Sequence, residues 1–218
     1  MSKGEQTIQK ILRAARELFY TTGFEATTSR AIADKANVNL GLLNYYFKSK
    51  NEIGRQIYST IRRQLDADIN KYESSLSEVE SFIFSSAIEL YLCLNCTPYS
   101  KFYHELLSNP TNRLSTIEHI KKTIINNTDD AIGDEVSYKE AYITMATLSI
   151  SSIKPTLVDY AITHPGEIPS NMYLKYYIEQ QLFYFNLPAE NSNFYLDKLT
   201  HYHIDVVERF TPVFVPLA

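Results

Sequence analysis

Apolar residues recur at intervals of three and four along most of the chain, which is the period of amphipathic α-helices. The first such segment covers about 6–21, and its apolar face consists of Ile8, Ile11, Leu12, Ala15, Leu18 and Phe19. Gly23 follows this segment, and a glycine in that place adopts the left-handed conformation that ends many helices. The pattern therefore predicts an opening helix that stops just before Gly23.

Two short helices are predicted next, over about 29–36 and 39–47. Thr27 or Thr28 is the expected N-cap of the first, since a hydroxyl there satisfies a free backbone N–H. Asn37 is expected to reverse the chain between the two helices, because asparagine tolerates a positive φ better than other non-glycine residues. Two helices joined by so short a turn are typical of a helix-turn-helix.

The remainder of the chain is also predicted to form helices, separated by capping residues and prolines. Serine and glutamate three residues apart form capping boxes, and boxes that begin at Ser49, Ser77, Ser115 and Ser137 mark four helix starts. Pro155 is expected to kink or split the helix that follows Ser137. The predicted helices cover about 50–72, 77–96, 99–108, 115–127, 137–163 and 170–187, with a last one from Asn191 or Asn193 to about Phe210.

The sequence therefore predicts an all-α protein of about nine to ten helices. Glycine accounts for only 6 of the 218 residues and proline for 8, which fits long helices with short connections. We expect an N-terminal three-helix domain of residues 1–50 that holds the helix-turn-helix, and a C-terminal helical bundle of residues 51–218. The helix predicted at about 50–72 connects the two units, because isoleucine or leucine recurs every four residues from Ile53 to Ile69.

The charge is divided along the chain. Up to Arg63 there are 11 lysines and arginines and 5 acidic residues, whereas the remainder has 10 and 20. Attraction to phosphate is local, since salt screens it beyond about 8 Å. A basic N-terminal unit on an acidic body is what a polyanion-binding module joined to a non-binding module would show, although charge alone does not decide this.

The second short helix has the properties of a helix that reads DNA. Ala33 supplies a small residue where the two helices cross, and Ile32, Val38 and Leu43 can hold them together. Short polar side chains read base edges in a major groove, and a glycine lets the helix approach closely. The outward residues are Asn39, Leu40, Gly41, Asn44 and Tyr45, with Lys48 and Lys50 just beyond, where phosphates would lie.

Several other classes of protein are disfavoured. No apolar run approaches the roughly 18 residues that span a bilayer, and charges interrupt the N-terminal segment, so we expect a cytoplasmic protein. Cys93 and Cys96 lie within a predicted helix without a second cysteine pair, which favours buried, reduced cysteines over a zinc or redox site. His201 and His203 point to different helix faces and form no metal pair. No catalytic or cofactor motif appears, so we expect no enzyme, no cofactor and no metal.

The stretch from Phe24 to Lys50 closely resembles the DNA-binding domain of the tetracycline-repressor (TetR) family. The resemblance covers about residues 6–60, and its most specific part is the run from Gly41 to Lys50 with its Tyr-Phe-x-Ser-Lys ending. It implies a homodimeric transcription regulator, usually a repressor that a small-molecule effector releases from a near-palindromic double-stranded DNA operator. The residues so implied in DNA binding are Thr28, Ser29, Arg30, Asn39, Leu40, Gly41, Leu42, Asn44, Tyr45, Tyr46, Lys48 and Lys50.

Two of these positions depart from the commonest family pattern. Leu40 stands where many members have lysine, and Asn44 stands where many have tyrosine, so the base preference of relatives does not transfer. Leu40 is instead suited to touch a thymine methyl group. Two further residues have a structural alternative: Thr28 as an N-cap only, and Tyr46 as part of the core.

The resemblance implies that the two C-terminal helices pack against those of the partner as a four-helix bundle. The last two predicted helices each have two adjacent apolar stripes, which suggests burial against both the chain's own core and a partner. The residues predicted at the dimer interface are Tyr173, Tyr177, Ile178, Leu182, Phe185, Leu199, Tyr202, Val206 and Phe210.

An effector pocket is expected within the helices of about 77–163. The candidate lining residues are Tyr91, Cys93, Phe102, Tyr103, His104, Tyr142, Met145 and Tyr160. Aromatic walls without an evident charge cluster favour a flat or lipophilic small molecule. The alternative is a DNA-binding regulator that responds to a protein partner instead of a small molecule.

Overall fold

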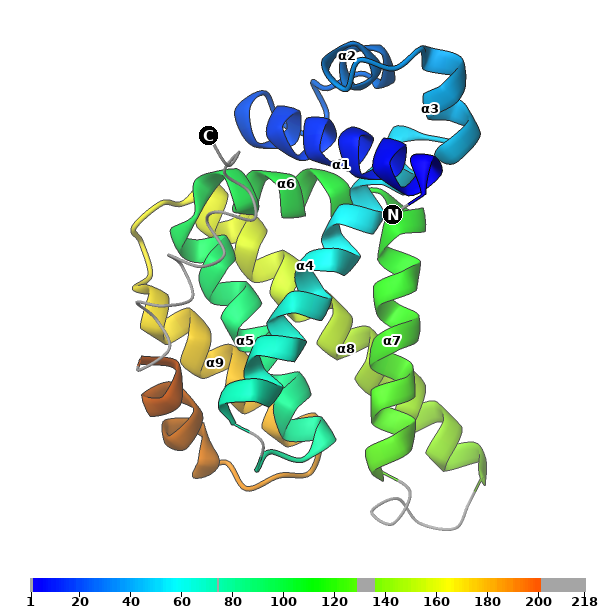
Figure 1. Cartoon of the computed structure of the whole chain (residues 1–218). Coiled ribbons are helices and arrows are strands. Elements are labelled where there is room, and N and C mark those ends of the chain that lie inside the picture. Colours follow the sequence, from blue (N-terminus) through cyan, green and yellow to red (C-terminus); the bar gives the residue numbers. More distant parts are fainter. Residues whose placement is uncertain (1, 74, 129–135, 201–218) are drawn as a thin grey trace.

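The computed structural model describes residues 2–73, 75–128 and 136–200, and within them the chain is entirely helical apart from its turns (Figure 1). The N-terminal unit contains α1 (Lys3–Thr21), α2 (Ser29–Lys35) and α3 (Leu40–Tyr46). The body consists of α4 (Lys50–Tyr72), α5 (Glu78–Asn95), α6 (Thr97–Leu107), α7 (Pro110–Thr128), α8 (Val136–Thr163) and α9 (Ser170–Tyr184), and residues 191–200 are helical as well. The predicted all-α class is confirmed.

The local signals that predicted the helix ends act as expected in most places. Gly23 has a φ of 100° after α1, and Asn37 has a φ of 53° between α2 and α3. The hydroxyl of Thr28 accepts a hydrogen bond from the backbone N–H of Ala31, so Thr28 is the N-cap of α2. The turn residues therefore set the path of the chain through the helix-turn-helix.

Two boundaries in the body differ from the sequence prediction because of proline. Pro110 begins α7, five residues earlier than expected, since proline is well tolerated in the first turn of a helix. The side chain of Asn109 accepts the N–H of Thr111 at 2.9 Å and so caps this start. Pro155 lies inside α8, which continues through it as one helix. The last predicted helix is present from residue 191, and its expected end near Phe210 lies outside the described residues.

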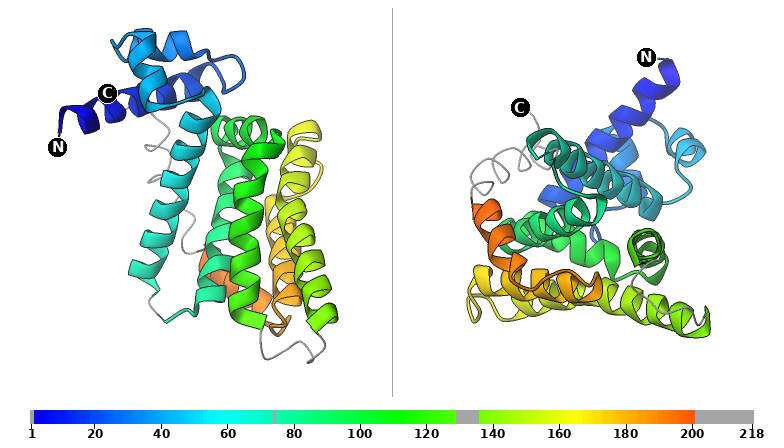
Figure 2. Two further views of the ribbon diagram at one scale, coloured as in Figure 1. Left: turned by 90° about the vertical axis from the view of Figure 1, so that its right-hand side faces the viewer. Right: turned by 90° about the horizontal axis from the view of Figure 1, so that it is seen from below.

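The helices of the body form layers. In the left view of Figure 2, α4 lies on one side, α5 and α7 lie in the middle, and α8 lies on the other side with α9 against it. The N-terminal unit sits at one end of the body, where α1 crosses above α6 (Figure 1).

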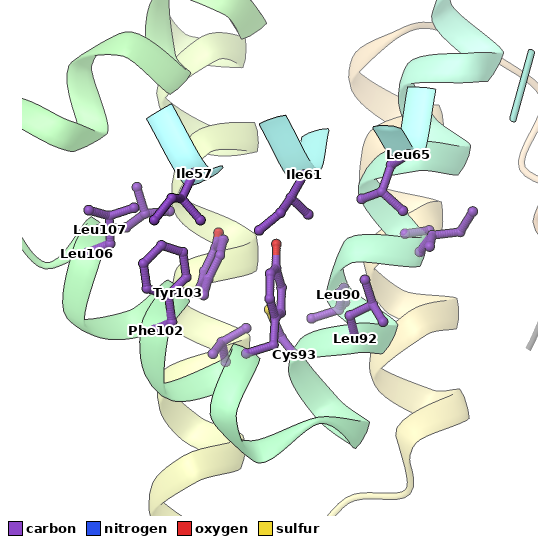
Figure 3. Packing of buried hydrophobic residues seen from close by; sticks show 14 of the residues in the cluster. Ile57, Ile61, Leu65, Leu90, Leu92, Cys93, Phe102, Tyr103, Leu106 and Leu107 are labelled. Carbon is purple, nitrogen blue, oxygen red and sulfur yellow. The ribbon is translucent and has the colours of Figure 1, made fainter. Parts of the chain in front are cut away.

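The core is continuous from the N-terminal unit into the body. Figure 3 shows Ile57 and Ile61 of α4 pointing toward Phe102 and Tyr103 of α6, and all four side chains are buried. The isoleucine repeat of α4 therefore packs one side of this helix against the body, as the sequence predicted for a connecting helix.

Among the described residues, no single helix combines the length and apolar character that a bilayer-spanning segment needs. α5 and α6 meet that standard only as a pair, with a bend of 113° between them.

Candidate nucleic-acid interface and ligand cavity

One side of α3 holds the N-terminal unit together, and the other side is open. Leu43 and Phe47 are buried against α1 and α2, whereas Gly41, Asn44 and Tyr45 face outward. Tyr45 is 80% exposed, the highest value among the large apolar and aromatic residues that the structure describes. A short helix is thus fixed by its inner side chains and offers its outer ones to another molecule.

Asn39 has a second role at the start of this helix. Its side-chain oxygen accepts the backbone N–H of Leu42 at 2.7 Å, so Asn39 is the N-cap of α3. The residue as a whole is exposed, so its amide NH₂ group can still donate to another molecule. Capping of this kind fixes the orientation of the side chain before any ligand arrives.

Lys50, predicted to hold a phosphate, is engaged within the chain. Its ammonium group donates to the carbonyl oxygens of Phe24 at 2.7 Å and Glu25 at 3.1 Å, and it lies 4.6 Å from the centre of the Phe24 ring. The first residue of α4 therefore fastens the loop between α1 and α2. One of the three ammonium protons remains for a further acceptor.

The residues predicted to contact DNA come from two stretches of the chain, 28–30 and 39–50, and differ in exposure. Thr28, Arg30, Asn39, Gly41, Asn44, Tyr45 and Lys48 are exposed, and Ser29, Leu40, Leu42, Tyr46 and Lys50 are half-buried. The Tyr46 ring packs against the start of α1, where a methyl group added at Gly4 would lie 3.2 Å from its hydroxyl. The twelve residues come from the start of α2, from α3 and the turn that follows it, and from the first residue of α4.

Aromatic rings join this unit to the body. Phe19 of α1 stacks on Phe102 of α6 with ring centres 5.7 Å apart, and Phe24 meets the same ring edge-on at 6.0 Å. The backbone N–H of Glu25 donates to the carboxylate of Glu105 at 2.9 Å. The position of the N-terminal unit is therefore set by α6 as well as by α4.

A cavity of about 460 Å³ lies inside the body, which is within the usual range for small-molecule sites. Its walls come from six helices, α4 to α9. The exposed lining residues Ser59 and Arg63 belong to α4, and Arg113 and His119 belong to α7. The cavity consequently opens between α4 and α7.

A buried ion cluster forms part of the cavity wall. Glu89 of α5 is fully buried, and its carboxylate pairs with Lys154 of α8 and with Arg62 of α4 at 3.3 Å. Tyr99 donates its hydroxyl to the same carboxylate at 2.9 Å. Burial alone would raise the pKa of Glu89, but the charges of Lys154 and Arg62 outweigh it and bring the pKa to about 2.

This cluster links three helices through charged groups that sequence reasoning missed. Arg62 also donates to the backbone oxygen and the hydroxyl of Ser85, at 3.3 and 3.1 Å, so most of its donors are used inside the chain. The sequence did contain a signal, because Glu89 interrupts the apolar stretch from Ile88 to Leu94. A carboxylate in a buried helix requires a cation from elsewhere in the fold.

The predicted pocket residues are spread over several places. Tyr103 lines the 460 Å³ cavity, while Cys93 and His104 line a second hollow between the α5–α6 region and the loop after α8. Phe102 is buried between the two units, and Tyr142 donates to the backbone oxygen of Tyr184 at 3.1 Å. The remaining three, Tyr91, Met145 and Tyr160, line neither space.

The predicted dimer residues also need to be located. Tyr173, Tyr177, Ile178, Leu182, Phe185 and Leu199 are already buried within the single chain. Tyr202, Val206 and Phe210 lie outside the described residues. The exposed stripe of α9 is formed by other side chains, namely Met172, Tyr176 and Phe183, and α8 exposes Met145 and Leu148.

In the part of the chain that the structure describes, no three His, Cys, Asp or Glu side chains are placed to bind one metal ion. Cys93 is buried and Cys96 is half-buried, and both are free thiols. Burial raises the pKa of Cys93 well above its usual range, which keeps this thiol protonated.

Comparison with known proteins places the N-terminal unit in a family. Residues 11–57 match the family model of bacterial regulatory proteins, tetR family. The matched segment runs from α1 through α3 into the first turns of α4, and it contains the whole surface described above. No curated protein matches the chain.

Solved structures share the fold over most of the chain. TylP, a TetR regulator from Streptomyces fradiae, superposes with a TM-score of 0.55 at 16% identity, over 91% of this chain and 92% of its own. SmeT, the repressor of the Stenotrophomonas maltophilia multidrug efflux pump SmeDEF, gives 0.54 at 14% identity, over 84% and 91%. The fatty acid degradation regulator FadR from Bacillus halodurans gives 0.54 at 14% identity, over 84% and 97%.

Proposed function

The chain belongs to the TetR family of DNA-binding transcriptional regulators, and we propose that it is a homodimeric repressor that a small molecule releases from its operator. Proteins of this family are regulators and not enzymes. The observation that carries the proposal is the combination of an open outer face on α3 with a cavity of about 460 Å³ that touches α4. The first can bind DNA, and the second can hold the effector.

The DNA-reading unit of the proposal comprises residues 1–50, and residues 51–218 bind the effector and the partner subunit. Asn44 and Tyr45 are placed to meet base edges, because they extend from the middle of the exposed side of α3. Arg30 and Lys48 are exposed near the two ends of this surface, where the DNA backbone would pass. The third ammonium proton of Lys50 is free for a phosphate oxygen.

The dimer of the proposal uses the exposed apolar sides of α8 and α9. Met172, Tyr176 and Phe183 recur along one side of α9 with exposed fractions of 59%, 50% and 71%. Met145 and Leu148 are exposed on α8, which packs against α9. Contiguous apolar surface of this kind, rich in aromatic residues and methionine, is typical of the centre of a protein interface. A twofold axis there would place two α3 helices on successive major grooves, about 34 Å apart.

The coupling between effector and DNA passes through Leu106. This residue of α6 lines the cavity and also lies against α4 at Gly54, where a methyl group added to the glycine would come within 2.8 Å of Leu106 and 2.7 Å of Phe24. Phe24 belongs to the loop that Lys50 fastens. A ligand that displaces Leu106 therefore acts directly on the contacts that hold the DNA-reading unit against the body.

Relatives with this fold support the effector part of the proposal. One solved structure of SmeT is a complex with triclosan, and SmeT is a repressor. The cavity of the present chain is of a size that would hold such a molecule.

The test of the proposed function begins with selection of binding sites from random double-stranded DNA by the full chain. We expect enrichment of a near-palindrome that binds at nanomolar concentration, with an affinity that falls steeply as salt increases. Binding without sequence preference, or no binding, would contradict the proposal. Sedimentation of the protein with a Phe183→Glu substitution tests the dimer surface, and Lys175→Glu on the same helix is the matched control.

A further inference from the structure

We infer that the effector is an amphipathic organic acid, whose carboxylate lies among the arginines at the mouth of the cavity and whose apolar body lies deeper. This inference rests on the proposed function, since it names the chemical class of the molecule that the same cavity takes. Its evidence is the distribution of charge and of apolar side chains around the cavity.

Positive charge predominates in the lining. Arg55, Arg62 and Arg63 come from α4, Arg113 comes from α7, and Lys154 comes from α8. Only two carboxylates, Glu89 and Asp66, belong to the same wall. Burial and then the nearby charge of Arg62 lower the pKa of His119, so this lining residue is neutral at pH 7. The sequence predicted a cavity without a charge cluster, and this prediction is wrong, because five cationic side chains line the cavity.

The two carboxylates are already satisfied by the inner cations. Glu89 pairs with Lys154 and Arg62, and Asp66 lies 3.8 Å from the same Arg62. These four groups balance each other in charge. The excess of positive charge in the lining is consequently carried by the other three arginines.

Those three arginines have no acidic partner among the described residues. Arg63 donates to the Ser59 carbonyl and the Thr60 hydroxyl, and Arg113 donates through Nε to the Leu107 carbonyl at 3.3 Å. Arg55 makes no hydrogen bond or ion pair within the described part of the chain. Their guanidinium groups have N–H donors left over, in the planar arrangement that matches a carboxylate.

This cluster stands out against its surroundings. From residue 51 onward the chain has 21 acidic residues and 13 lysines and arginines, so a cavity in this body would be expected to have an acidic lining. Instead the mouth between α4 and α7 is basic. A site of this kind attracts anions and disfavours cationic molecules of the same size.

The deeper wall suits the apolar part of such a molecule. Tyr103, Leu106 and Leu107 of α6 line it, together with Ile150 of α8 and Tyr177 of α9, and all five are buried. An apolar body placed there would gain roughly 25 cal/mol for each Å² removed from water. The cavity thus has one basic end and one apolar end.

The experiment measures displacement of the fluorescent sulfonate 8-anilinonaphthalene-1-sulfonate from the full chain in the absence of DNA. The competitors are two matched pairs, 2-naphthoate with 2-naphthamide and decanoate with decanamide. We expect each carboxylate to displace the probe at a concentration at least about tenfold lower than its carboxamide, as a charge-assisted pair of hydrogen bonds would give.

The variant for this test is Arg63→Gln with Arg113→Gln. Both side chains are exposed, so the folded chain should tolerate the change, and its melting temperature is measured alongside. We expect the double variant to lose the preference for the carboxylates. The charge-matched control, Lys121→Gln with Lys175→Gln, removes two exposed cations that lie outside the cavity and should keep the preference.

Equal displacement by acid and amide, or a preference that survives in the arginine variant, would overturn the inference. Failure of the probe to bind the chain would also overturn the inference. Operator binding of the ligand-free protein is measured on the same samples, so that the two proposals fail separately. Protein that binds its selected DNA but shows no preference for acids refutes the effector class and leaves the proposed repressor intact.

Discussion

Leu106 lies so close to Gly54 that a methyl group added to the glycine would come within 2.8 Å of the leucine Cδ1 atom. This contact joins α6 to α4 at the level of the loop that leads into α2. Leu106 also lines the cavity, so the same side chain borders the proposed effector and the contacts that hold the DNA-reading unit against the body. The close approach exists because residue 54 has no Cβ atom.

Substitution Gly54→Ala tests this contact. Alanine favours a helix by about 1 kcal/mol over glycine, but overpacking against Phe24 and Leu106 should cost about 1–3 kcal/mol, so we expect net destabilisation in urea unfolding. The effector should also release DNA less completely from this variant. Gln56→Ala, an exposed change on the same helix, should move stability by less than about 0.5 kcal/mol. If Gly54→Ala is more stable than the unmodified chain, Phe24 and Leu106 leave enough space for the added methyl group.

Asn44→Ala and Tyr45→Ala test the reading surface of α3. Each should lower affinity for the selected operator by about tenfold, as loss of one base contact does, while the melting temperature stays the same because both side chains are exposed. Fluorescence anisotropy with operator and with scrambled DNA measures the effect. Gln180→Ala on α9 serves as the control. Operator affinity equal to that of the unmodified chain would remove these residues from the interface.

Lys50→Met separates two roles of one side chain. Loss of the hydrogen bonds to Phe24 and Glu25 should reduce stability by about 1–3 kcal/mol. If the remaining proton also meets a phosphate, the slope of log affinity against log salt should decrease by about one. A variant that is less stable but keeps the full salt slope would assign Lys50 to structure alone.

Glu89→Gln should destabilise the chain by about 3–5 kcal/mol, because it leaves Lys154 buried without its counter-charge and removes the nearer of the two carboxylates that pair with Arg62. Adding Lys154→Met should recover part of this loss, since it removes the unpaired cation. Chemical unfolding of the two variants measures both effects. A single substitution with no cost would mean that water reaches the cluster freely.

The acid stability of the chain should reflect the same carboxylate. Glu89 has a pKa of about 2 when folded and an ordinary value of 4.5, so the folded state binds its proton less readily than the unfolded state does. Its contribution is therefore fully present above about pH 4.5 and is lost as the pH falls towards about 2, for a total of about 3 kcal/mol. Unfolding of the unmodified chain and of the Glu89→Gln, Lys154→Met variant is compared from pH 6 to 3. The double variant should show the shallower dependence, and parallel curves would contradict the assignment.

The N-terminal unit could be predicted from the sequence because local residues determine it. Gly23, Thr28 and Asn37 act within a few residues of their own position, and each adopts the cap or the backbone conformation expected of it. The capping box formed by Ser77 and Glu80 acts in the same way in the body. Signals of this kind can be read without knowledge of which helices are neighbours.

The cavity could not be predicted in the same way, since its walls come from helices far apart in the chain. The pairing of Glu89 with Lys154 joins residues 65 positions apart, and no local pattern specifies it. The outward side of α9 posed a similar problem. A helical wheel shows two apolar stripes, but only the neighbours α5 and α8 decide that Tyr173 and Tyr177 turn inward while Tyr176 and Phe183 turn outward.

The unbroken course of α4 transmits a tilt of this helix at the cavity to the DNA-reading unit. Its 23 residues span about 35 Å, and no flexible joint separates the arginines at the cavity from Lys50 at the far end. A rigid rod of this length that pivots at its Tyr72 end moves its Lys50 end by about 0.6 Å for each degree of tilt. A rotation of about 5° would thus shift α3 by about 3 Å, close to the rise of one base pair. If the two α3 helices of the proposed dimer move in opposite directions, their spacing no longer matches that of successive major grooves.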